Sequence, residues 1–211
     1  MRKEKEILEI MEVFEKEKPN PECELIFHNA YTLLVAVILS AQATDKGVNK
    51  ATKHLFEVVD SPEKMLKLGE EGLKNYIKSI GLFNNKAKNI ILMSQELLDK
   101  FGGKVPDNRE DLETLSGVGR KTANVVLNVW YKKPALAVDT HVMRVSKRLG
   151  FTKGKTPLAI ELDLLKILPK KYVINANHWF VLFGRYICKA QHPKCSQCSI
   201  SQFCNSKDKK I

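Results

Sequence analysis

Apolar residues recur at helical spacing along almost the whole chain. In the first segment Ile7, Met11 and Phe14 follow an i, i+4, i+7 spacing, which places them on one face of a helix. Residues 31–43 are apolar on nearly all sides, as expected for a central buried helix. No stretch shows the sustained two-residue alternation of a half-buried strand. The pattern therefore predicts an all-α fold.

Caps and helix breakers divide this pattern into separate elements. Ser61-Pro62 and Thr156-Pro157 each combine an N-cap residue with proline at the first helical position, and Asn108 can cap another helix. Gly69 is placed to stop the helix that begins at Ser61. The other predicted helices are one with the apolar stripe Val48, Ala51, Leu55 and Val58, a short one ending at Gly81, and five more over residues 87–101, about 120–133, 142–149, 157–168 and 172–187.

The charge balance points to a polyanionic partner. The chain has 211 residues, with 35 Lys and Arg against 24 Asp and Glu, a formal net charge of +11 and a pI near 9.4. Such a basic chain often binds nucleic acid, although the excess charge could also be a solvated surface with no special partner. With 44% hydrophobic residues, the chain can bury one sizeable core or two small ones.

The N-terminus and the apolar runs favour a soluble, intracellular protein. The first 18 residues are charged and helical, without the apolar centre and cleavage site of a signal peptide. The longest apolar run, Leu33 to Leu39, is far shorter than the ~20 residues that cross a bilayer. We expect a cytoplasmic location, no membrane partner and a monomer.

The segment Gly117-Val118-Gly119-Arg120-Lys121 lies between two helical patterns. Glycine permits a tight turn and lets the backbone approach a ligand closely. The start of the following helix offers backbone N–H groups and a dipole that favour phosphate, and the two basic residues add charge there. A bare G-x-G is more often an ordinary helix connection, so the flanking residues must carry the argument.

Asp139 and four cysteines form two further candidate sites. Asp139 follows the apolar Ala137-Val138 and precedes a helix. This position predicts an N-cap, and a capping carboxylate can also border a cleft. Cys188, Cys195, Cys198 and Cys204 fall within the last 24 residues, and the fifth cysteine is Cys23. Inside a cell this clustering favours a metal centre over disulfides, and the spacing leaves zinc and a four-iron cluster open.

Several motifs together resemble one family. LSGVGRKTANVVLN, the following VDTHVMRVSKRLG, the early SAQATD and the four-cysteine tail occur in the right order and at the right distances. From the first helix to Cys204, the chain is similar to the endonuclease III family of the helix-hairpin-helix DNA glycosylase superfamily. One departure is Ser116, where the hairpin usually carries proline, and we expect it to loosen the turn slightly.

The resemblance implies a role for each candidate residue. Lys121 matches the nucleophilic lysine, Asp139 matches the catalytic aspartate, and the four clustered cysteines match the ligands of a [4Fe-4S] cluster. The implied DNA contacts are Gln42, Leu82 and His141, the hairpin residues Gly117, Val118, Gly119 and Arg120, and the basic loop residues Lys189 and Lys194. Without the resemblance, packing in the core would be the preferred interpretation of Leu82.

The resemblance also implies the architecture and the reaction. The fold would be two helical domains with a DNA-binding cleft between them: residues 22–132 with the hairpin, and residues 1–21 plus 133–211 with the cluster. The enzyme would act at the nucleoid on double-stranded DNA that contains damaged bases, with oxidised pyrimidines as the expected class, or abasic sites. It would remove the base and then cleave the strand 3′ to the abasic site by β-elimination.

Two other functions remain open at this point. A non-catalytic DNA-binding module could use the same hairpin, but Lys121 and Asp139 would then have no purpose at the matching positions. A relative that only removes bases usually lacks the lysine, and adenine-removing relatives carry a further C-terminal domain for which 211 residues leave no room. The residues that line a base pocket are scattered over several helices, so the sequence does not define which lesions are removed.

Overall fold

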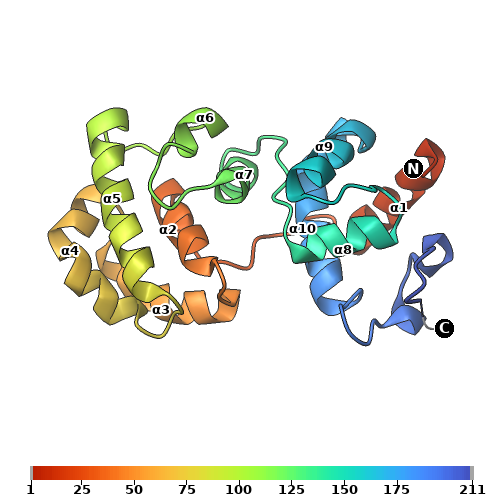
Figure 1. Cartoon of the computed structure of the whole chain (residues 1–211), viewed down its shortest axis with the longest axis horizontal. Helices are drawn as coiled ribbons and strands as arrows, with labels where there is room; N and C mark the ends of the chain where they lie inside the picture. The colour runs from red at the N-terminus through yellow and green to blue at the C-terminus, as the bar shows by residue number, and fades with distance from the viewer. Residues whose placement is uncertain (1, 210–211) are drawn as a thin grey trace. The chain divides into compact units, whose positions relative to one another are not determined.

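The computed structural model describes residues 2–209, and these residues form helices and no strand. This confirms the predicted all-α class. The chain divides into two compact units, shown with their helices in Figure 1. Unit 1 comprises residues 1–22 and 134–211, and unit 2 comprises residues 23–133.

Unit 2 is built around one apolar helix, α2 (Ala30–Ser40). Every residue from Tyr31 to Leu39 is buried, as the all-round apolar pattern predicted. Helix α2 contacts α3, α5 and α7, while α4 packs on α3 and α5 and α6 packs on α7. The bounds of the surrounding helices are α3 (Asp45–Val58), α4 (Pro62–Ile77), α5 (Phe83–Phe101), α6 (Arg109–Leu112) and α7 (Arg120–Val129).

The predicted caps of unit 2 are confirmed, and one predicted helix end is wrong. The side chains of Ser61 and Asn108 accept hydrogen bonds from backbone N–H groups of α4 and α6. Gly69 has left-handed φ (74°) and ψ of 170°, which is not helical, so the helix that begins at Pro62 stops there as predicted and a second helix follows across a kink within α4. The helix after this kink ends at Ile77 instead of Gly81, because residues 78–82 form a turn.

Unit 1 joins the first helix of the chain to its C-terminal part. Helix α10 (Lys170–Tyr186) contacts both α8 (Thr140–Arg148) and α1 (Glu4–Glu17). Gly184 of α10 allows the close approach of α8, since a Cβ atom there would lie 2.9 Å from the Cβ of His141. The remaining elements are α9 (Pro157–Ile167) and two 3₁₀ turns, η1 (Cys195–Gln197) and η2 (Ser201–Phe203).

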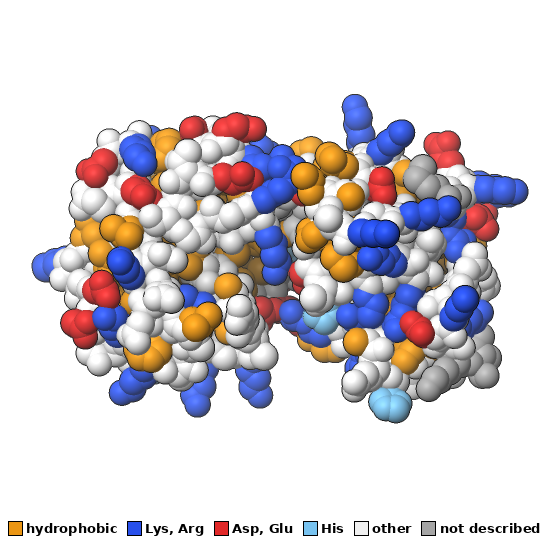
Figure 2. Space-filling model, in the orientation of Figure 1, with side chains coloured by type: hydrophobic (Ala, Val, Ile, Leu, Met, Phe, Trp, Pro, Cys, Tyr) orange, Lys and Arg blue, Asp and Glu red, His pale blue; other side chains and the backbone are white. Residues whose placement is uncertain are grey.

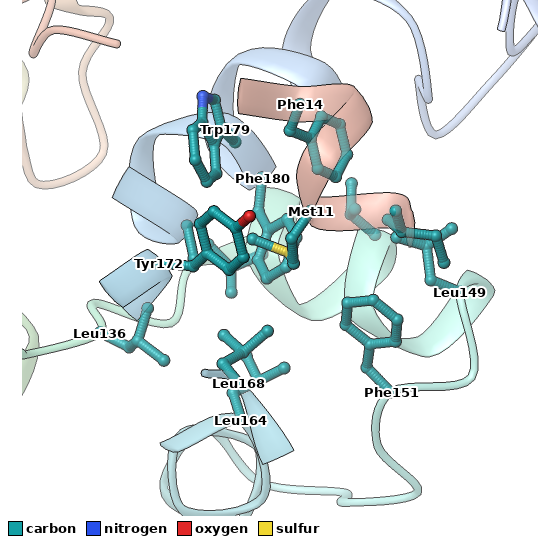
Figure 3. Packing of buried hydrophobic residues seen from close by; sticks show 14 of the residues in the cluster. Met11, Phe14, Leu136, Leu149, Phe151, Leu164, Leu168, Tyr172, Trp179 and Phe180 are labelled. Carbon is teal, nitrogen blue, oxygen red and sulfur yellow. The ribbon is translucent and has the colours of Figure 1, made fainter. Parts of the chain in front are cut away.

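The core of unit 1 explains why residues 1–22 belong with the C-terminal part. Figure 3 shows Phe14 of α1 among the rings of α10. Its ring stacks on that of Trp179 at 6.2 Å between centroids and meets those of Phe180 and Phe183 edge to face. Trp179 also donates its ring N–H to the Lys18 carbonyl at 2.8 Å. Burying a ring such as Phe14 contributes about 1.5–3 kcal/mol, which ties α1 to α10.

Among residues 2–209, none of the helices combines the length and the apolar character that crossing a membrane requires.

Candidate active site and cysteine loop

In unit 2, a glycine turn connects α6 to α7. Gly117 has φ of +77°, and a Cβ atom there would lie 3.0 Å from the Cβ of Asn89 on α5, so both the conformation and the packing demand glycine. Val118 is buried and donates its N–H to the Leu115 carbonyl at 3.0 Å, which closes the turn. At Gly119 a Cβ atom would meet nothing within 4 Å, so this backbone lies open to a ligand.

Lys121 stands in the first turn of α7, directly after this open backbone. Gly119 is the N-cap of the helix, and within the described chain no side chain caps it. Lys121 is exposed and Arg120 is half-buried beside it. A helix N-terminus repels a positive charge and attracts an anion. The arrangement can therefore bind phosphate through the backbone.

In unit 1, Asp139 is the N-cap of α8, as its sequence position predicted. Its Oδ1 atom accepts hydrogen bonds from the backbone N–H groups of His141 and Val142, both at 2.8 Å. The preceding segment is fixed by Asn177 of α10, whose Oδ1 accepts the N–H of Ala137 at 2.9 Å. Asp139 is only half-buried. One carboxylate oxygen therefore orients the side chain, and the other makes no hydrogen bond to a described residue.

His141 lies two residues after Asp139 and is tied to the cysteine loop through Arg144. The Arg144 guanidinium lies 3.1 Å from the His141 ring nitrogen Nδ1. It also donates to the carbonyl oxygens of Cys188 at 2.9 Å and Gly184 at 2.8 Å. The start of α8, the end of α10 and the first residue of the cysteine loop are thus held together by one side chain.

Gln42 and Leu82 share an unusual backbone conformation in unit 2. Both are exposed, and both have left-handed φ, 55° for Gln42 and 59° for Leu82. Leu82 is 58% exposed, so packing in the core is the wrong interpretation of this residue. Gln42 and Gly81 border the same hollow, whose other lining residues are Ala43, Thr44, Gly47, Ser79 and Ile80.

The four C-terminal cysteines line one cavity in unit 1. Arg148 donates one hydrogen bond to the Cys188 sulfur at 3.4 Å and another to the Lys189 carbonyl at 2.7 Å. Burial raises the pKa of the Cys198 thiol, and the other three thiols act in the same direction.

No three of the described His, Cys, Asp and Glu side chains are placed to hold a single metal ion, so the fit rests on donor type and cavity. Four thiolates around one cavity repel each other unless cations lie among them, and four thiolates are the donor set of an iron-sulfur cluster.

The basic residues of the cysteine loop point away from the core. Lys189 and Lys194 are both exposed, and their backbone N–H groups donate to the same carbonyl, that of Ile187. Figure 2 shows further lysine and arginine side chains spread over the visible face of each unit, with acidic residues among them. The loop backbone presents two cations to solvent, and neither forms an ion pair with a residue among 2–209.

Comparison with known proteins assigns the family. Residues 35–170 match the HhH-GPD superfamily of base excision DNA repair proteins, and residues 188–204 match the iron-sulfur binding domain of endonuclease III. The endonuclease III of Rickettsia prowazekii is 58% identical over 195 residues, covering 92% of each chain. That of Escherichia coli K12 is 49% identical over 202 residues, covering 96% of each chain. The chain belongs to the endonuclease III family.

A solved structure agrees with this assignment. A trapped covalent intermediate of endonuclease III with DNA superposes with a TM-score of 0.91 at 46% identity, covering 97% of each chain. Like the family, the protein is a bifunctional enzyme of base excision repair, a DNA glycosylase that also cleaves abasic sites, and it carries a [4Fe-4S] cluster. The resemblance inferred from the hairpin, aspartate and cysteine motifs is confirmed.

Sequence reasoning missed several residues that hold these sites, among them Arg148 and Lys86. Arg148 fixes the cysteine loop, and Lys86 lies buried next to the segment that carries Gln42. A signal for Lys86 was present in the sequence: it takes the first position of the buried stripe Lys86, Ile90, Met93 and Leu97 on α5. A lysine in an apolar stripe is rare unless its ammonium has partners. Nothing comparable marked Arg148.

Proposed function

We propose that the enzyme excises oxidised pyrimidines from double-stranded DNA and cleaves the strand through a Schiff base on Lys121. The observation that carries the proposal is the exposed lysine in the first turn of α7, two residues after the open backbone of Gly119. A relative trapped as a covalent intermediate with DNA supports a nucleophilic mechanism for this chain too. A glycosylase that only removes bases, or a module that only binds DNA, would not need a nucleophilic lysine at this position.

The reaction begins when the neutral Lys121 amine attacks C1′ of the damaged nucleotide. The bond between C1′ and the base breaks, its electron pair leaves with the base, and the base takes up a proton. The sugar ring then opens and the amine forms a Schiff base with C1′. Removal of a C2′ proton expels the 3′ phosphate oxygen by β-elimination, and water finally releases the lysine.

Asp139 is proposed to act on the charge that this sequence creates. Positive charge develops on the sugar as the base departs, and a carboxylate placed beside it lowers the energy of that state. The same group can accept and return protons during opening of the sugar and elimination. Its Oδ1 atom is occupied by the two N–H groups at the start of α8, so we assign this chemistry to the other oxygen.

The remaining predicted residues are proposed to bind DNA. The hairpin residues Gly117, Val118, Gly119 and Arg120 would hold phosphate near the lesion. A flipped nucleotide leaves a gap in the stack, and creating it costs a few kcal/mol. The exposed Gln42 amide and the exposed Leu82 side chain are suited to fill that gap, and His141 to contact the damaged strand. Lys189 and Lys194 would contact phosphates from the cysteine loop.

The cluster is proposed to be held by Cys188, Cys195, Cys198 and Cys204. When bound, it fixes the shape of the loop and takes no part in the bond changes. Lys189 and Lys194 lie between the first two ligands, Cys188 and Cys195. The shape of the loop therefore determines the positions of their charges.

We further propose that the enzyme acts as a monomer and is associated with the nucleoid, since its net charge of +11 favours DNA.

Borohydride trapping tests the central assignment. Borohydride reduces a Schiff base, so adding it during turnover should give a covalent protein–DNA complex with the wild-type enzyme. Lys121→Gln should abolish trapping and strand cleavage while binding to DNA persists. Lys46→Gln, a matched change at another exposed lysine, should behave as wild type. A trapped complex formed by Lys121→Gln at the wild-type rate would identify another nucleophile, with Lys46 and the N-terminal amine tested next.

A further inference from the structure

Lys86, which the proposed reaction does not use, is almost fully buried in unit 2. It lies in the first turn of α5 and is 6% exposed. Its ammonium donates two hydrogen bonds to backbone carbonyl oxygens, that of Leu39 at 2.9 Å and that of Ala41 at 2.6 Å. These carbonyls belong to the last turn of α2 and the residue after it, where helical partners run out.

Lys86 also contacts the second segment that carries a proposed DNA-stack residue. Its backbone N–H donates to the Leu82 carbonyl at 3.1 Å. The Ala41 carbonyl that its ammonium holds forms the peptide bond to Gln42. The bond to the Leu82 carbonyl is the first helical hydrogen bond of α5, so the lysine side chain, through its bonds to the Leu39 and Ala41 carbonyls, ties the segment before Gln42 to the helix turn that Leu82 begins.

Gln42 and Leu82 have a conformation that needs support. A left-handed backbone is unfavourable for a residue other than glycine and persists only where the surroundings determine it, at a cost of about 1–3 kcal/mol. Gln42 and Leu82 both adopt it, with φ of 55° and 59°. Residues of both segments, Gln42 to Thr44 and Ser79 to Gly81, line the same hollow. The Lys86 side chain connects α5, which begins after Leu82, to the backbone just before Gln42.

We propose that Lys86 is a positioning residue, which locks the backbones of Gln42 and Leu82 in the arrangement that lets both side chains enter the DNA stack together. The proposal rests on the function proposed above for Gln42 and Leu82 and adds how the two are held in register. An inserted pair must be rigid before DNA arrives, because ordering it at the moment of insertion would weaken insertion.

A purely structural role makes a different prediction. If Lys86 only caps α2, its loss should lower stability and affect every substrate alike. If it positions the inserting pair, the loss should appear where a base stack has to be entered. A single-stranded oligonucleotide with an abasic site has no stacked duplex and no opposite base, yet it uses the same Lys121 chemistry.

The experiment compares these two substrates under single-turnover conditions. In Lys86→Met, excision of an oxidised pyrimidine from a duplex should slow about tenfold or more, as expected for losing hydrogen bonds made by a charged group. Cleavage of the abasic single strand should stay within about twofold of wild type. Lys88→Met removes the same charge at an exposed position on the same helix and should leave both rates unchanged.

Hydrogen exchange gives a second readout and covers the case in which Lys86→Met folds poorly. Lys86→Gln keeps a neutral donor at the site, and the amides of residues 41–47 and 82–83 should exchange faster in it while those of α7 do not. Equal loss on both substrates, or duplex excision by Lys86→Met at the Lys88→Met rate, would overturn the proposal.

The variants Gln42→Ala and Leu82→Ala distinguish failure of the Lys86 proposal from failure of the DNA-stack role proposed for Gln42 and Leu82. If these variants excise from duplex at the wild-type rate, the insertion role is wrong and the Lys86 proposal falls with it. If they are slow while Lys86→Met is not, only the Lys86 proposal is overturned.

Discussion

Glu96 on α5 fixes the hairpin turn through both of its carboxylate oxygens, which accept hydrogen bonds from Ser116. The Ser116 backbone N–H donates to Oε2 at 2.7 Å, and the Ser116 hydroxyl donates to Oε1 at 2.9 Å. Proline, the usual residue at this place in the family, has neither donor. Serine was expected to loosen the turn, but its two charge-assisted hydrogen bonds to Glu96 hold the turn in a way that proline could not.

Removing this carboxylate should therefore destabilise unit 2 and loosen the hairpin. Glu96→Ala should lower the free energy of unfolding by about 1–3 kcal/mol, because it leaves the N–H and hydroxyl of the half-buried Ser116 without their acceptor. Affinity for undamaged duplex should fall as well, since the hairpin backbone would be less ordered before binding. Denaturant unfolding and a binding titration measure the two effects.

Ser116→Ala is the matched control for this prediction. It keeps the backbone hydrogen bond to Oε2 and removes only the hydroxyl bond to Oε1, so its loss of stability should be clearly smaller than that of Glu96→Ala. Equal stability of Glu96→Ala and wild type would show that the carboxylate pair contributes nothing to the turn.

The sequence predicted local features well because local rules set them. Ser61, Asn108, Asp139 and Thr156 all cap helices as expected, since an N-cap depends on residues two or three positions away. The apolar stripes likewise identified the buried faces, and the motifs identified Lys121 and the cysteine loop as candidates.

Contacts between distant segments escaped prediction. Glu96 and Ser116 are 20 positions apart, and Lys86 and Leu39 are 47 positions apart. Neither pair has a periodic or spacing signal, because such contacts follow from how helices pack. The left-handed backbone of Gln42 and Leu82 was also hidden, since neither residue type favours that conformation. Helical periodicity gave no sign that the first helix packs with α10.

The second prediction concerns the cluster ligands. Purified enzyme should be yellow-brown with about four irons per chain. Cys198→Ser should lose the iron and the visible absorbance, because one of four thiolates around the cavity is removed. Cys23→Ser is the control: this cysteine lies in unit 2 and its replacement should leave iron content unchanged. Colourless wild-type protein with stoichiometric zinc would contradict the assignment of the cysteine cavity.

The third prediction concerns the exposed lysines of the cysteine loop. Binding to undamaged duplex should weaken steeply with salt, with a log–log slope of about −0.9 for each phosphate neutralised. Replacing Lys189 or Lys194 by alanine should make this slope shallower by roughly one contact on any sequence. Lys5→Ala, on the exposed surface of α1, serves as control because its side chain is 88% exposed but lies outside the predicted contacts. Wild-type slopes for both the Lys189 and the Lys194 variants would show that these lysines do not contact phosphate.

The last prediction separates the two roles of Asp139. As the N-cap of α8 it accepts the N–H groups of His141 and Val142 through one oxygen. Asparagine caps a helix about as well as aspartate, so Asp139→Asn should change stability little, whereas Asp139→Ala should cost about 0.5–2 kcal/mol. Both remove the negative charge, so both should slow excision by a factor of about 10²–10⁴ if the carboxylate moves protons.

Comparing thermal unfolding with single-turnover excision for Asp139→Asn, Asp139→Ala and Asp139→Ser distinguishes the roles. Serine also caps, so Asp139→Ser should match Asp139→Asn in stability and match Asp139→Ala in rate. A set of rates that instead follows stability, with the two capped variants near wild type, would mean that Asp139 acts only by shaping α8. The charge of the carboxylate would then be irrelevant to the chemistry, and another acid would have to stabilise the sugar.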